Sequence, residues 1–375
     1  MQLNSIKDAG NLAGKAILLR ASLNVPLENH KVRNQFRLEK ALPTLEFLQK
    51  AGARVVVVAH IGRDPSDTLL PVHQALQAYI EIKWGGEVSK DNYPKQVSSM
   101  QNGELILFEN LRQDDREYEN DTEFAKLLTA PVDLYVNDAF ANAHREHASM
   151  SVVANCVPAY AGIQLQKEVE ALEEAMSPQS PSLFILGGAK FATKLNLVDE
   201  YLELYDQLFI GGALLHDIMR ARGLEIGRSL TSEVSLSETD WLTNEKLVLP
   251  QDVLVRTEAG ATEVRPLTGV LSSDTIYDCG PDTIAWLEEN TQNAQTILWN
   301  GPLGNYESGY VEGTEALAKA IAKSNADSYV GGGDTVAAIS SLELFVDFTF
   351  VSTGGGAMLA FLEKGTLPTL ELLQG

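Results

Sequence analysis

Short apolar runs recur along this sequence, each followed by a turn and a longer amphipathic segment, and this alternation restricts the fold more than any other feature. The runs have four to six residues rich in Val, Ile, Leu and Phe, as strands buried on both faces do. They lie in KAILLRASLN, ARVVVVAHIG, GELILFENLR and PVDLYVNDAF in the first half, and in SLFILGGAK, QLFIGGALL, TILWNGPLG, SYVGGGDT and FTFVSTGGG in the second. Intervening segments such as RLEKALPTLEFLQKAG and GTEALAKAIAKS have helical periodicity. Strands that alternate with helices predict an α/β fold with doubly wound parallel sheets.

A chain of 375 residues is long for a single core, so we expect two α/β domains. The segment GIQLQKEVEALEEAMSPQSPS is the predicted junction, because its apolar residues form one helical stripe and its Ser/Pro cluster ends the helix. The stripe consists of Leu165, Val169, Leu172 and Met176. The predicted boundaries are residues 1–162 for the first domain, 163–176 for the linker helix and 177–357 for the second domain.

Composition excludes several classes of function. The net charge is −22, from 51 acidic and 29 basic residues, which argues against general binding to nucleic acids or anionic membranes. The start of the chain lacks a signal-peptide pattern, and no apolar run approaches the ~18 residues of a membrane helix. Cys156 and Cys279 are far apart and lack metal-ligand spacing, so we expect a cytoplasmic protein without disulfides or a zinc site. We interpret the acidic stretch at residues 113–123 as a solvated loop and helix start.

The residues that follow the predicted strands differ between the two halves, and open parallel sheets bind ligands at those ends. The first half has cations, amides and imidazoles there: Arg20, Asn24, His60, Arg63, Asn110, Arg112, Asn137, His144 and Arg145. The second half has glycines there, at positions 187–188, 211–212, 301, 331–333 and 354–356. The first set suits a small, highly charged anion, whereas bare backbone N–H groups suit the phosphates of a nucleotide. Together the two sets suggest a kinase.

The motif GGDT at residues 332–335 is predicted to open a helix whose N–H groups hold phosphate. Asp334 is then a candidate anchor for a magnesium nucleotide, because Mg²⁺ takes one or two carboxylates and keeps several waters. The alternative makes Asp334 an ordinary N-cap. The second glycine triplet, at residues 354–356, favours the nucleotide interpretation.

The motif GGAKFATK places Lys190 and Lys194 four residues apart, on one face of a helix predicted to begin beside two glycines. It is not a Walker A loop, but both ammonium groups are expected to reach phosphates over that helix terminus. The alternative is that the two lysines lie on a solvated helix face and bind no ligand.

In the motif WNGPLGNYE, Asn300 ends a strand and Glu307 is a candidate to bind the ribose hydroxyls. The alternative is an ordinary Asn-Gly turn followed by a surface acid.

Arginines occur at several consecutive strand ends of the first half. Their planar guanidinium groups match phosphate and carboxylate oxygens. A single buried arginine is more often part of a structural ion pair, but pairing four or five with interior acids is costly. We interpret His147 as structural, and His30 and His73 as solvent-facing.

Nine motifs, in order and in approximate spacing, resemble the phosphoglycerate kinase family over nearly the whole chain: NVP, ALPT, HIGR, ENLR, VNDAF…AHR.HAS, LGGAK…K, WNGP.G..E, GGGDT and STGGGA. Each is weak alone, but nine in order are highly specific. The resemblance implies two Rossmann-like domains joined by a helix with a cleft between them, and residues 358–375 packing back on the first domain. It implies a cytoplasmic monomer that transfers a phosphoryl group reversibly between 1,3-bisphosphoglycerate with MgADP and 3-phosphoglycerate with MgATP in glycolysis. Mg²⁺ is the implied cofactor, and no nucleic acid or membrane is an implied partner.

The resemblance also implies roles for individual residues. The substrate-binding positions would be Ser22, Leu23, Asn24, Arg37, His60, Ile61, Gly62, Arg63, Arg112 and Arg145. The nucleotide-binding positions would be Lys194, Gly211, Gly212, Asn300, Glu307, Gly332, Gly333, Asp334 and Thr335, with Asp334 also on the metal. The catalytic positions would be Arg37, Lys190 and Gly355, which hold the phosphoryl group during transfer.

The implied chemistry fits these residue types. A carboxylate acceptor is already ionised at neutral pH, so the enzyme needs in-line positioning and charge neutralisation rather than a general base. An acyl phosphate hydrolyses readily, so closure of two hinged domains would exclude water. The first glycine triplet would let backbone N–H groups approach the nucleotide phosphates, and the second would present N–H groups to the group in transfer.

The chain departs from the family pattern at several positions. Ser22 replaces the Asp of the family's R-V-D-F-N pattern, which helps hold the glycerate hydroxyl; the loss of charge would weaken binding by on the order of 1 kcal/mol or more. Ala213 replaces a glycine on the adenine side. The segment HIGRDPSDTLLPV is shortened, and EKGTLPT replaces the usual ending.

The sequence bears on three alternatives to this enzyme. A dinucleotide-dependent dehydrogenase shares the fold, but the sequence has no G-x-G-x-x-G after a strand with an acid about twenty residues on. A non-catalytic nucleotide-binding relative is supported by Ser22 and opposed by four retained residues, Arg37, Lys190, Lys194 and Asp334. A related kinase for another phosphorylated carboxylic acid is the stronger rival, because Ser22 affects only substrate selection.

Overall fold

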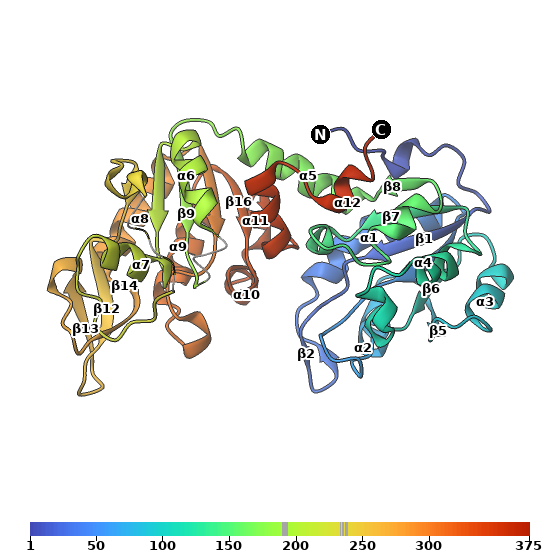
Figure 1. Cartoon of the computed structure of the whole chain (residues 1–375), viewed down its shortest axis with the longest axis horizontal. Helices are drawn as coiled ribbons and strands as arrows, with labels where there is room; N and C mark the ends of the chain where they lie inside the picture. The colour runs from blue at the N-terminus through green and yellow to red at the C-terminus, as the bar shows by residue number, and fades with distance from the viewer. Residues whose placement is uncertain (190–193, 233, 235, 237–238) are drawn as a thin grey trace. The chain divides into compact units, whose positions relative to one another are not determined.

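The computed structural model describes residues 1–189, 194–232, 234, 236 and 239–375, so Lys190 lies outside the described residues. The chain divides into two compact units (Figure 1). Unit 1 comprises Met1–Glu170 with Lys364–Gly375, and unit 2 comprises Ala171–Glu363. Helix α5 (Ile163–Ala175) carries the chain from unit 1 into unit 2. Across the described part of the chain, no helix combines the length and apolar character needed to cross a membrane.

Unit 1 is built on a six-stranded sheet with the order β5-β6-β4-β1-β7-β8, in which all neighbours are parallel. Its strands are β1 (Ala16–Ala21), β4 (Arg54–Val58), β5 (Lys83–Gly86), β6 (Leu105–Phe108), β7 (Leu134–Asp138) and β8 (Ala159–Ala161). In the register of the central strands, Arg20 of β1 lies opposite Val58 of β4 and Asn137 of β7. The carboxyl ends of these strands therefore meet at one edge of the sheet.

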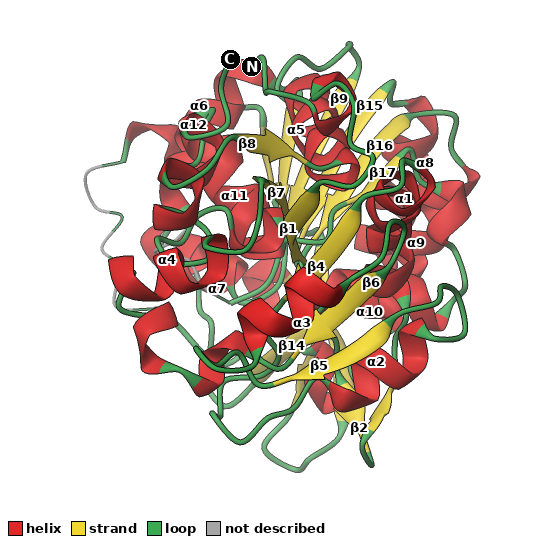
Figure 2. Ribbon diagram, turned by 90° about the vertical axis from the view of Figure 1, so that its right-hand side faces the viewer, coloured by secondary structure: helices red, strands yellow, loops and turns green. Residues whose placement is uncertain are grey.

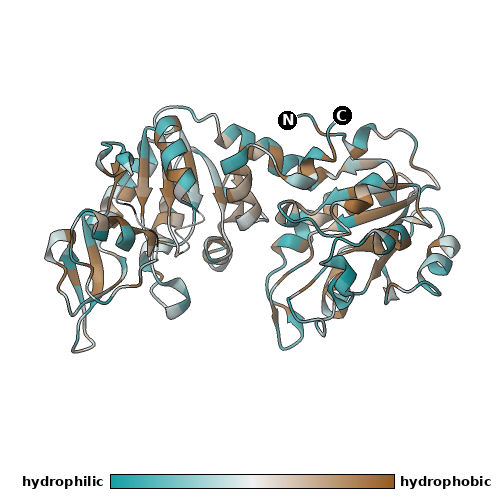
Figure 3. Ribbon diagram, viewed as in Figure 1, coloured by the Kyte–Doolittle hydropathy of each residue, from teal (hydrophilic) through white to brown (hydrophobic). Residues whose placement is uncertain are grey.

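Alternate residues of the central strands of unit 1 pack on opposite faces of the sheet. Ile17 and Leu19 join a core with α1 and α2, whereas Leu18 joins a core with α3 and α4. These helices are α1 (Phe36–Lys50), α2 (Leu70–Leu76), α3 (Tyr93–Ser99) and α4 (Thr122–Thr129). Figure 2 shows strands flanked by helices, and Figure 3 shows the hydrophobic colouring concentrated on the strands. Because both faces are covered, the strand sequences are apolar without alternation, and the predicted doubly wound α/β fold is confirmed.

The C-terminal tail belongs to unit 1 and contains α12 (Pro368–Glu371). The backbone N–H and the hydroxyl of Thr369 both donate to the carbonyl oxygen of Ala143, at 3.3 and 3.1 Å. Thr369 is fully buried. Since Arg145 lies two residues after Ala143, the tail anchors a loop that carries a predicted substrate residue.

We expect the substitution Thr369→Val to lower the free energy of unfolding by about 1 kcal/mol, because it removes the hydroxyl donor to Ala143 while keeping the side-chain shape. Thr366→Val is the matched control in the same tail, since the Thr366 hydroxyl is buried and has no hydrogen-bond partner among the described residues. Urea unfolding followed by circular dichroism measures both variants. Equal losses of stability in the two would contradict this prediction.

Unit 2 is built on a six-stranded parallel sheet with the order β11-β10-β9-β15-β16-β17. Its strands are β9 (Ser182–Leu186), β10 (Gln207–Ile210), β11 (Leu247–Val248), β15 (Thr296–Asn300), β16 (Asp327–Gly331) and β17 (Phe350–Val351). Its helices include α6 (Leu195–Leu204), α7 (Leu214–Ala221), α8 (Pro281–Asn293), α9 (Glu312–Lys323), α10 (Gly333–Ser341) and α11 (Gly355–Lys364). Numbered along the chain, this sheet has the 3-2-1-4-5-6 order of dinucleotide-binding folds, whose ligand crevice lies where the strand order reverses. In unit 2 that point is between β9 and β15.

Each of the nine apolar runs contains a strand, so those strand predictions are confirmed. The sequence did not predict strands β5, β8 and β11 of the two sheets. It also missed a three-stranded antiparallel sheet and a hairpin: β12 (Asp252–Arg256), β13 (Thr262–Pro266), β14 (Thr275–Cys279), β2 (Leu27–Glu28) and β3 (Lys31–Val32). The hairpin strands and β13 are largely exposed and rich in charged residues, so they lack the apolar signal of a buried strand.

Two side chains, His73 and Glu117, differ from expectation in their exposure. His73 is buried and its Nε2 lies 3.0 Å from the carbonyl oxygen of Ile82, so the prediction that it faces solvent is wrong. His30 is exposed, as predicted. Within residues 113–123, Asp121 caps α4 as a helix start should, but Glu117 is fully buried, so this stretch is not solvated throughout.

Candidate active site

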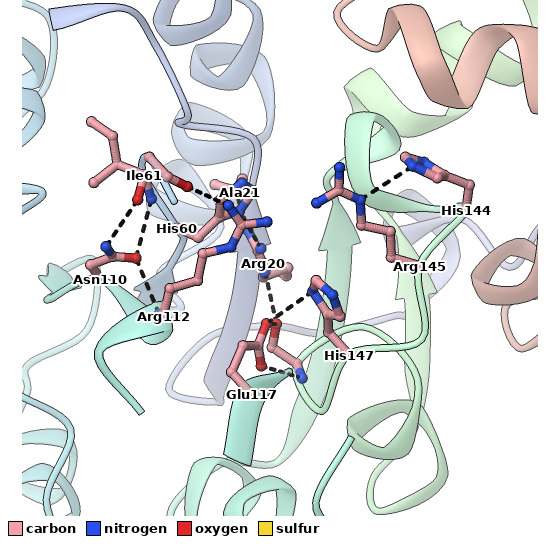
Figure 4. A network of polar contacts seen from close by, with 12 residues as sticks. Arg20, Ala21, His60, Ile61, Asn110, Arg112, Glu117, His144, Arg145 and His147 are labelled. Carbon is pink, nitrogen blue, oxygen red and sulfur yellow. Dashed lines mark hydrogen bonds and ion pairs between the residues drawn. The ribbon is translucent and has the colours of Figure 1, made fainter. Parts of the chain in front are cut away.

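The predicted anion-binding residues of unit 1 lie at the carboxyl edge of its sheet. Ser22, Leu23 and Asn24 follow β1, the segment from His60 to Arg63 follows β4, Arg112 follows β6 and Arg145 follows β7. Figure 4 shows His60, Arg20 and Arg112 close together, with Arg145 and His144 on the neighbouring loop. The side chains of Leu23 and Ile61 belong to the hydrophobic core, so only their backbone groups are available at this edge. Ser22 is buried, whereas Arg63 and Arg145 are exposed.

Asn110 joins the loops that follow β4 and β6. Its side-chain oxygen accepts from the N–H groups of Ile61 and Arg112, at 3.2 and 3.1 Å. Its side-chain nitrogen donates to the carbonyl oxygens of Ile61 and Asp67, at 3.0 and 2.9 Å. Asn110 is buried with all of its hydrogen-bonding groups used, so it positions backbone rather than contacting a ligand.

Arg112 is a buried cation held by neutral groups. Its guanidinium donates to the carbonyl oxygen of Gly62 and lies 5.1 Å from the ring centre of Tyr118. Burial lowers the pKa of Arg112, and the nearby charges of Arg145 and Arg20 act in the same direction. Like charges held close together at a sheet edge favour an anionic ligand between them.

Arg37 reaches the same edge from the first turn of α1. Its guanidinium donates to the carbonyl oxygen of Asn24, and the Asn24 side chain accepts from the N–H of Gly62 at 3.0 Å. Burial lowers the pKa of Arg37, while the carboxylate of Glu168 in α5 opposes this effect. Arg37, Asn24 and the loop after β4 thus form one connected group.

The start of α5 is capped by a buried carboxyl group from the end of β7. Asp138 accepts from the N–H of Leu165 at 2.9 Å and has a second oxygen that is buried without a partner among the described residues. Burial raises the pKa of Asp138 to about 6, against the hydrogen bonds from Thr44 and from the N–H groups of α5, and Glu168 raises it further. No feature of the sequence singles out Asp138.

Asp138 should make unfolding depend on pH. A carboxyl pKa raised to about 6 in the folded state means that the folded protein binds more protons than the unfolded one between pH ~4 and ~6. The free energy of unfolding should therefore fall as pH rises through this window, by roughly 3 kcal/mol. Asp138→Asn keeps a cap acceptor and removes the titration, so it should gain stability relative to the wild type as pH rises. Urea unfolding at several pH values checks this, with the exposed Asp91→Asn as control; a pH-independent difference for Asp138→Asn would contradict it.

The carboxyl edge of the unit 2 sheet is made of closely packed glycine backbone. A Cβ atom on Gly187 would lie 2.3 Å from the carbonyl oxygen of Pro302, and one on Gly301 would lie 2.4 Å from the carbonyl oxygen of Gly187. The N–H of Gly188 donates to the Pro302 carbonyl at 2.8 Å, and that of Gly212 donates to the Leu303 carbonyl at 3.0 Å. Close packing therefore requires glycine at these positions, because side chains would force the loops after β9 and β15 apart.

The two glycine triplets lie against each other. A Cβ atom on Gly355 would be 2.8 Å from the Cα of Gly332, so the starts of α10 and α11 approach at backbone distance. The first N–H groups of both helices have no acceptor within their helix. Nothing lies within 4 Å of a Cβ placed on Gly333 or Gly356, so packing does not require the third glycine of either triplet. Two helix termini with positive dipole ends side by side suit phosphate.

Asp334 is half-buried in the first turn of α10 and is not its N-cap. The N-cap is Gly332, so the interpretation of Asp334 as an ordinary cap is wrong. Thr335 is fully buried and its hydroxyl accepts from the N–H of Gly301 at 3.1 Å. No group of three or more acidic, His or Cys side chains that could hold a metal occurs in the described ranges. One carboxylate fits Mg²⁺ that arrives with a nucleotide, and not a metal held by protein ligands alone.

Lys194 is buried, and its ammonium donates to the carbonyl oxygen of Gly187 at the switch point of the unit 2 sheet. It is the N-cap of α6, so it lies directly before that helix. The predicted helix face shared by Lys190 and Lys194 falls on residues 190–193, outside the described residues. Lys190, the predicted companion of Lys194, lies outside the described residues.

Asn300 is buried at the end of β15, and its side-chain nitrogen lies 3.7 Å from the Met358 sulfur. Glu307 is exposed in the 3₁₀ helix Tyr306–Ser308, and Gly211 follows β10.

Comparisons with known proteins agree with this geometry. The family model described as phosphoglycerate kinase matches residues 6–365. The phosphoglycerate kinase of Methylorubrum extorquens is 38% identical over 393 aligned positions, which cover 99% of this chain and 98% of that protein. The solved structures of phosphoglycerate kinase from Coxiella burnetii and from Pyrococcus horikoshii are similar, with TM-scores of 0.81 and 0.87, identities of 37% and 30%, and coverage of 99% of this chain and 98% of each. The chain therefore belongs to the phosphoglycerate kinase family and is a kinase.

Proposed function

We propose that the carboxyl edge of the unit 1 sheet binds 3-phosphoglycerate or 1,3-bisphosphoglycerate, and that the carboxyl edge of the unit 2 sheet binds ATP or ADP. The reaction is the reversible phosphoryl transfer of the family, in glycolysis. The observation that carries the proposal is the cluster of Arg20, Arg112 and Arg145, in which the charge of Arg145 lowers the pKa of both Arg20 and Arg112. In a chain with a net charge of −22, several arginines brought together at one edge of one sheet favour an anion there.

The residues at the unit 1 edge suit a triose that carries a phosphate and a carboxylate. Guanidinium groups bind such oxygens through paired hydrogen bonds. The acceptor carboxylate is ionised, so the site needs no general base. We assign substrate binding here to Ser22, Asn24, Arg37, His60, Arg63, Arg112 and Arg145, with the backbone of Leu23, Ile61 and Gly62.

The residues at the unit 2 edge suit the phosphates of a nucleotide. Lys194 and the N–H groups that start α10 and α11 would contact phosphate oxygens, with Gly355 presenting its N–H to the group in transfer. Asp334 would hold Mg²⁺, which when bound neutralises phosphate charge. Gly211 and Gly212 would line the adenine site and Glu307 would accept from the ribose. Lys190 is assigned to the phosphoryl group from the family resemblance alone.

We further propose that units 1 and 2 are the triose and nucleotide domains, and that the protein works as a cytoplasmic monomer without nucleic-acid or membrane partners. The family resemblance supports the first point, and the acidic net charge supports the last. Size-exclusion chromatography with light scattering measures the oligomeric state.

The deciding experiment is ATP consumption with 3-phosphoglycerate, coupled to reduction of 1,3-bisphosphoglycerate, with and without Mg²⁺. Turnover that requires both 3-phosphoglycerate and Mg²⁺ is the expected result. If calorimetry detects MgATP binding but no turnover occurs, the assignment of the unit 1 substrate is wrong, and Ser22→Asp is the first variant to test. Turnover without Mg²⁺ would overturn the role of Asp334.

A further inference from the structure

Four buried side chains at the unit 1 edge form a continuous hydrogen-bonded relay that ends on His60. Glu117 accepts from the hydroxyl of Ser149 at 2.6 Å and from its N–H at 2.9 Å. The hydroxyl of Ser149 accepts from Nε of Arg20 at 2.9 Å, and the Arg20 guanidinium lies 2.8 Å from Nδ1 of His60. Figure 4 shows Arg20 between His60 and Glu117. Glu117, Ser149 and Arg20 are fully buried, and His60 is 4% exposed.

Ser149 is held firmly at the centre of this relay. Its N–H and hydroxyl are bound by both oxygens of Glu117, and its carbonyl oxygen accepts from the hydroxyl of Tyr135 at 2.8 Å. The other guanidinium nitrogen of Arg20 donates to the carbonyl oxygen of Ala21 at 2.8 Å. Because all three guanidinium nitrogens of Arg20 make hydrogen-bond contacts, the group is held in one orientation relative to His60.

The chemistry of the contact between Arg20 and His60 determines where the imidazole carries its proton. A guanidinium has only donors, so Nδ1 of His60 must be the acceptor. An imidazole that accepts at Nδ1 is neutral and carries its proton on Nε2. The alternative, an imidazolium, would place one more cation beside a guanidinium in a buried site.

The other groups that face His60 act in the same direction. They are Arg112 after β6, together with Arg145 and His147 on the loop after β7. Burial is the largest cause that lowers the pKa of His60, followed by the charge of Arg20 and then by these three. The acidic group of the relay, Glu117, contacts Ser149 and lies beyond Arg20, so it stabilises the guanidinium rather than an imidazolium.

We propose that Ser149 and Glu117 are positioning residues which, through Arg20, lock His60 as the neutral imidazole with its proton on Nε2. His60 then offers one hydrogen-bond donor, at Nε2, whose protonation does not change across the working pH range. Its use toward the phosphorylated substrate rests on the function proposed above. The tautomer itself does not, because it is a property of the free enzyme.

The test is a long-range proton–nitrogen correlation spectrum of the substrate-free enzyme with 15N-labelled histidines, from about pH 5.5 to 8. The chain has six histidines, and the variant His60→Asn assigns the signals of His60. The expected wild-type result is an unprotonated Nδ1 and a protonated Nε2 that do not shift with pH. A His60 that titrates in this range, or that carries its proton on Nδ1, would overturn the proposal whether or not 3-phosphoglycerate is the substrate.

Two variants distinguish the effect of the relay on the protonation of His60 from the effect of burial. In Ser149→Ala, Arg20 loses its serine contact and can pair with Glu117 directly, so Nδ1 of His60 loses its fixed donor and the His60 signals should move away from those of a ring protonated only at Nε2. The matched control is Ser151→Ala, since the Ser151 hydroxyl is buried in the same loop and has no hydrogen-bond partner among the described residues. That variant should leave the His60 signals unchanged.

A second variant and a binding readout keep the proposal testable if Ser149→Ala does not fold. Glu117→Gln removes the charge of the relay and keeps an acceptor for Ser149, so its His60 signals should move in the same direction as in Ser149→Ala, by a smaller amount. In either variant the ratio of the 3-phosphoglycerate dissociation constant to that of the wild type should vary with pH, whereas for Ser151→Ala it should stay constant. His60 signals identical to wild type in both relay variants would exclude a positioning role for Ser149 and Glu117.

Discussion

Replacing Arg37 by alanine is expected to lower kcat by about 10³-fold while the protein remains folded. Arg37 extends from the first turn of α1 to the Asn24 carbonyl, and its guanidinium is the cation of unit 1 assigned to the phosphoryl group in transfer. A charge that neutralises the moving group acts mainly in the transition state, so the loss should appear in kcat more than in KM. Lys190→Ala should have an effect of similar size, as the family resemblance implies.

The matched control for Arg37→Ala is Arg33→Ala. Arg33 lies four residues earlier, is exposed and pairs only loosely with Glu28, at 3.9 Å. Its loss should change kcat little, since exposed ion pairs contribute little. Steady-state kinetics in the coupled assay, with circular dichroism to confirm folding, measures both variants. If Arg37→Ala kept kcat within tenfold of the wild type, Arg37 would have no catalytic role.

Replacing Gly301 by alanine is expected to lower the free energy of unfolding by more than about 3 kcal/mol and to weaken ATP binding. Gly301 follows β15 with a φ of +95°, and a Cβ there would lie 2.4 Å from the carbonyl oxygen of Gly187. The clash is with backbone, which cannot rotate away as a side chain can. Relief requires the loops after β9 and β15 to separate, and Lys194 and Thr335 both bond to these loops.

Gly309→Ala separates steric clash from backbone strain. Gly309 has a similar φ of +88°, but nothing lies within 4 Å of a Cβ placed there. It should therefore cost only about 1 kcal/mol, from the left-handed conformation alone. Urea unfolding and calorimetric titration with MgATP measure the two effects. Similar losses in Gly301→Ala and Gly309→Ala would mean that close packing at the switch point is unimportant.

Features set by neighbours in sequence were predictable. The runs of Val, Ile and Leu in β4 and β9 indicate strands buried on both faces, because no other element of that length hides so many apolar residues in a row. Such strands place the residues that follow them at one sheet edge, which is why Asn24, His60 and Arg112 could be grouped from the sequence. The exposed strand β13 has no such signal and was missed.

Features set by contacts between distant segments were not predictable. In the sequence, Glu117 is one acid among many in its segment. It can be buried because Ser149, thirty-two positions later, donates hydrogen bonds to both of its carboxylate oxygens. The glycines at 332 and 355 suggested phosphate binding, and only the tertiary structure shows that they also let two helix starts touch.

The sequence by itself thus determined the fold class, nine of the twelve strands of the two sheets and the edges at which cations and glycines gather, because periodicity and composition act within a single segment. The tertiary structure decided which acids are buried, which arginine meets which imidazole, and which glycines are needed for packing. Those properties depend on distances of a few ångströms between segments far apart in the chain. Hydrogen bonding and desolvation energies change steeply over such distances, and no local pattern encodes them.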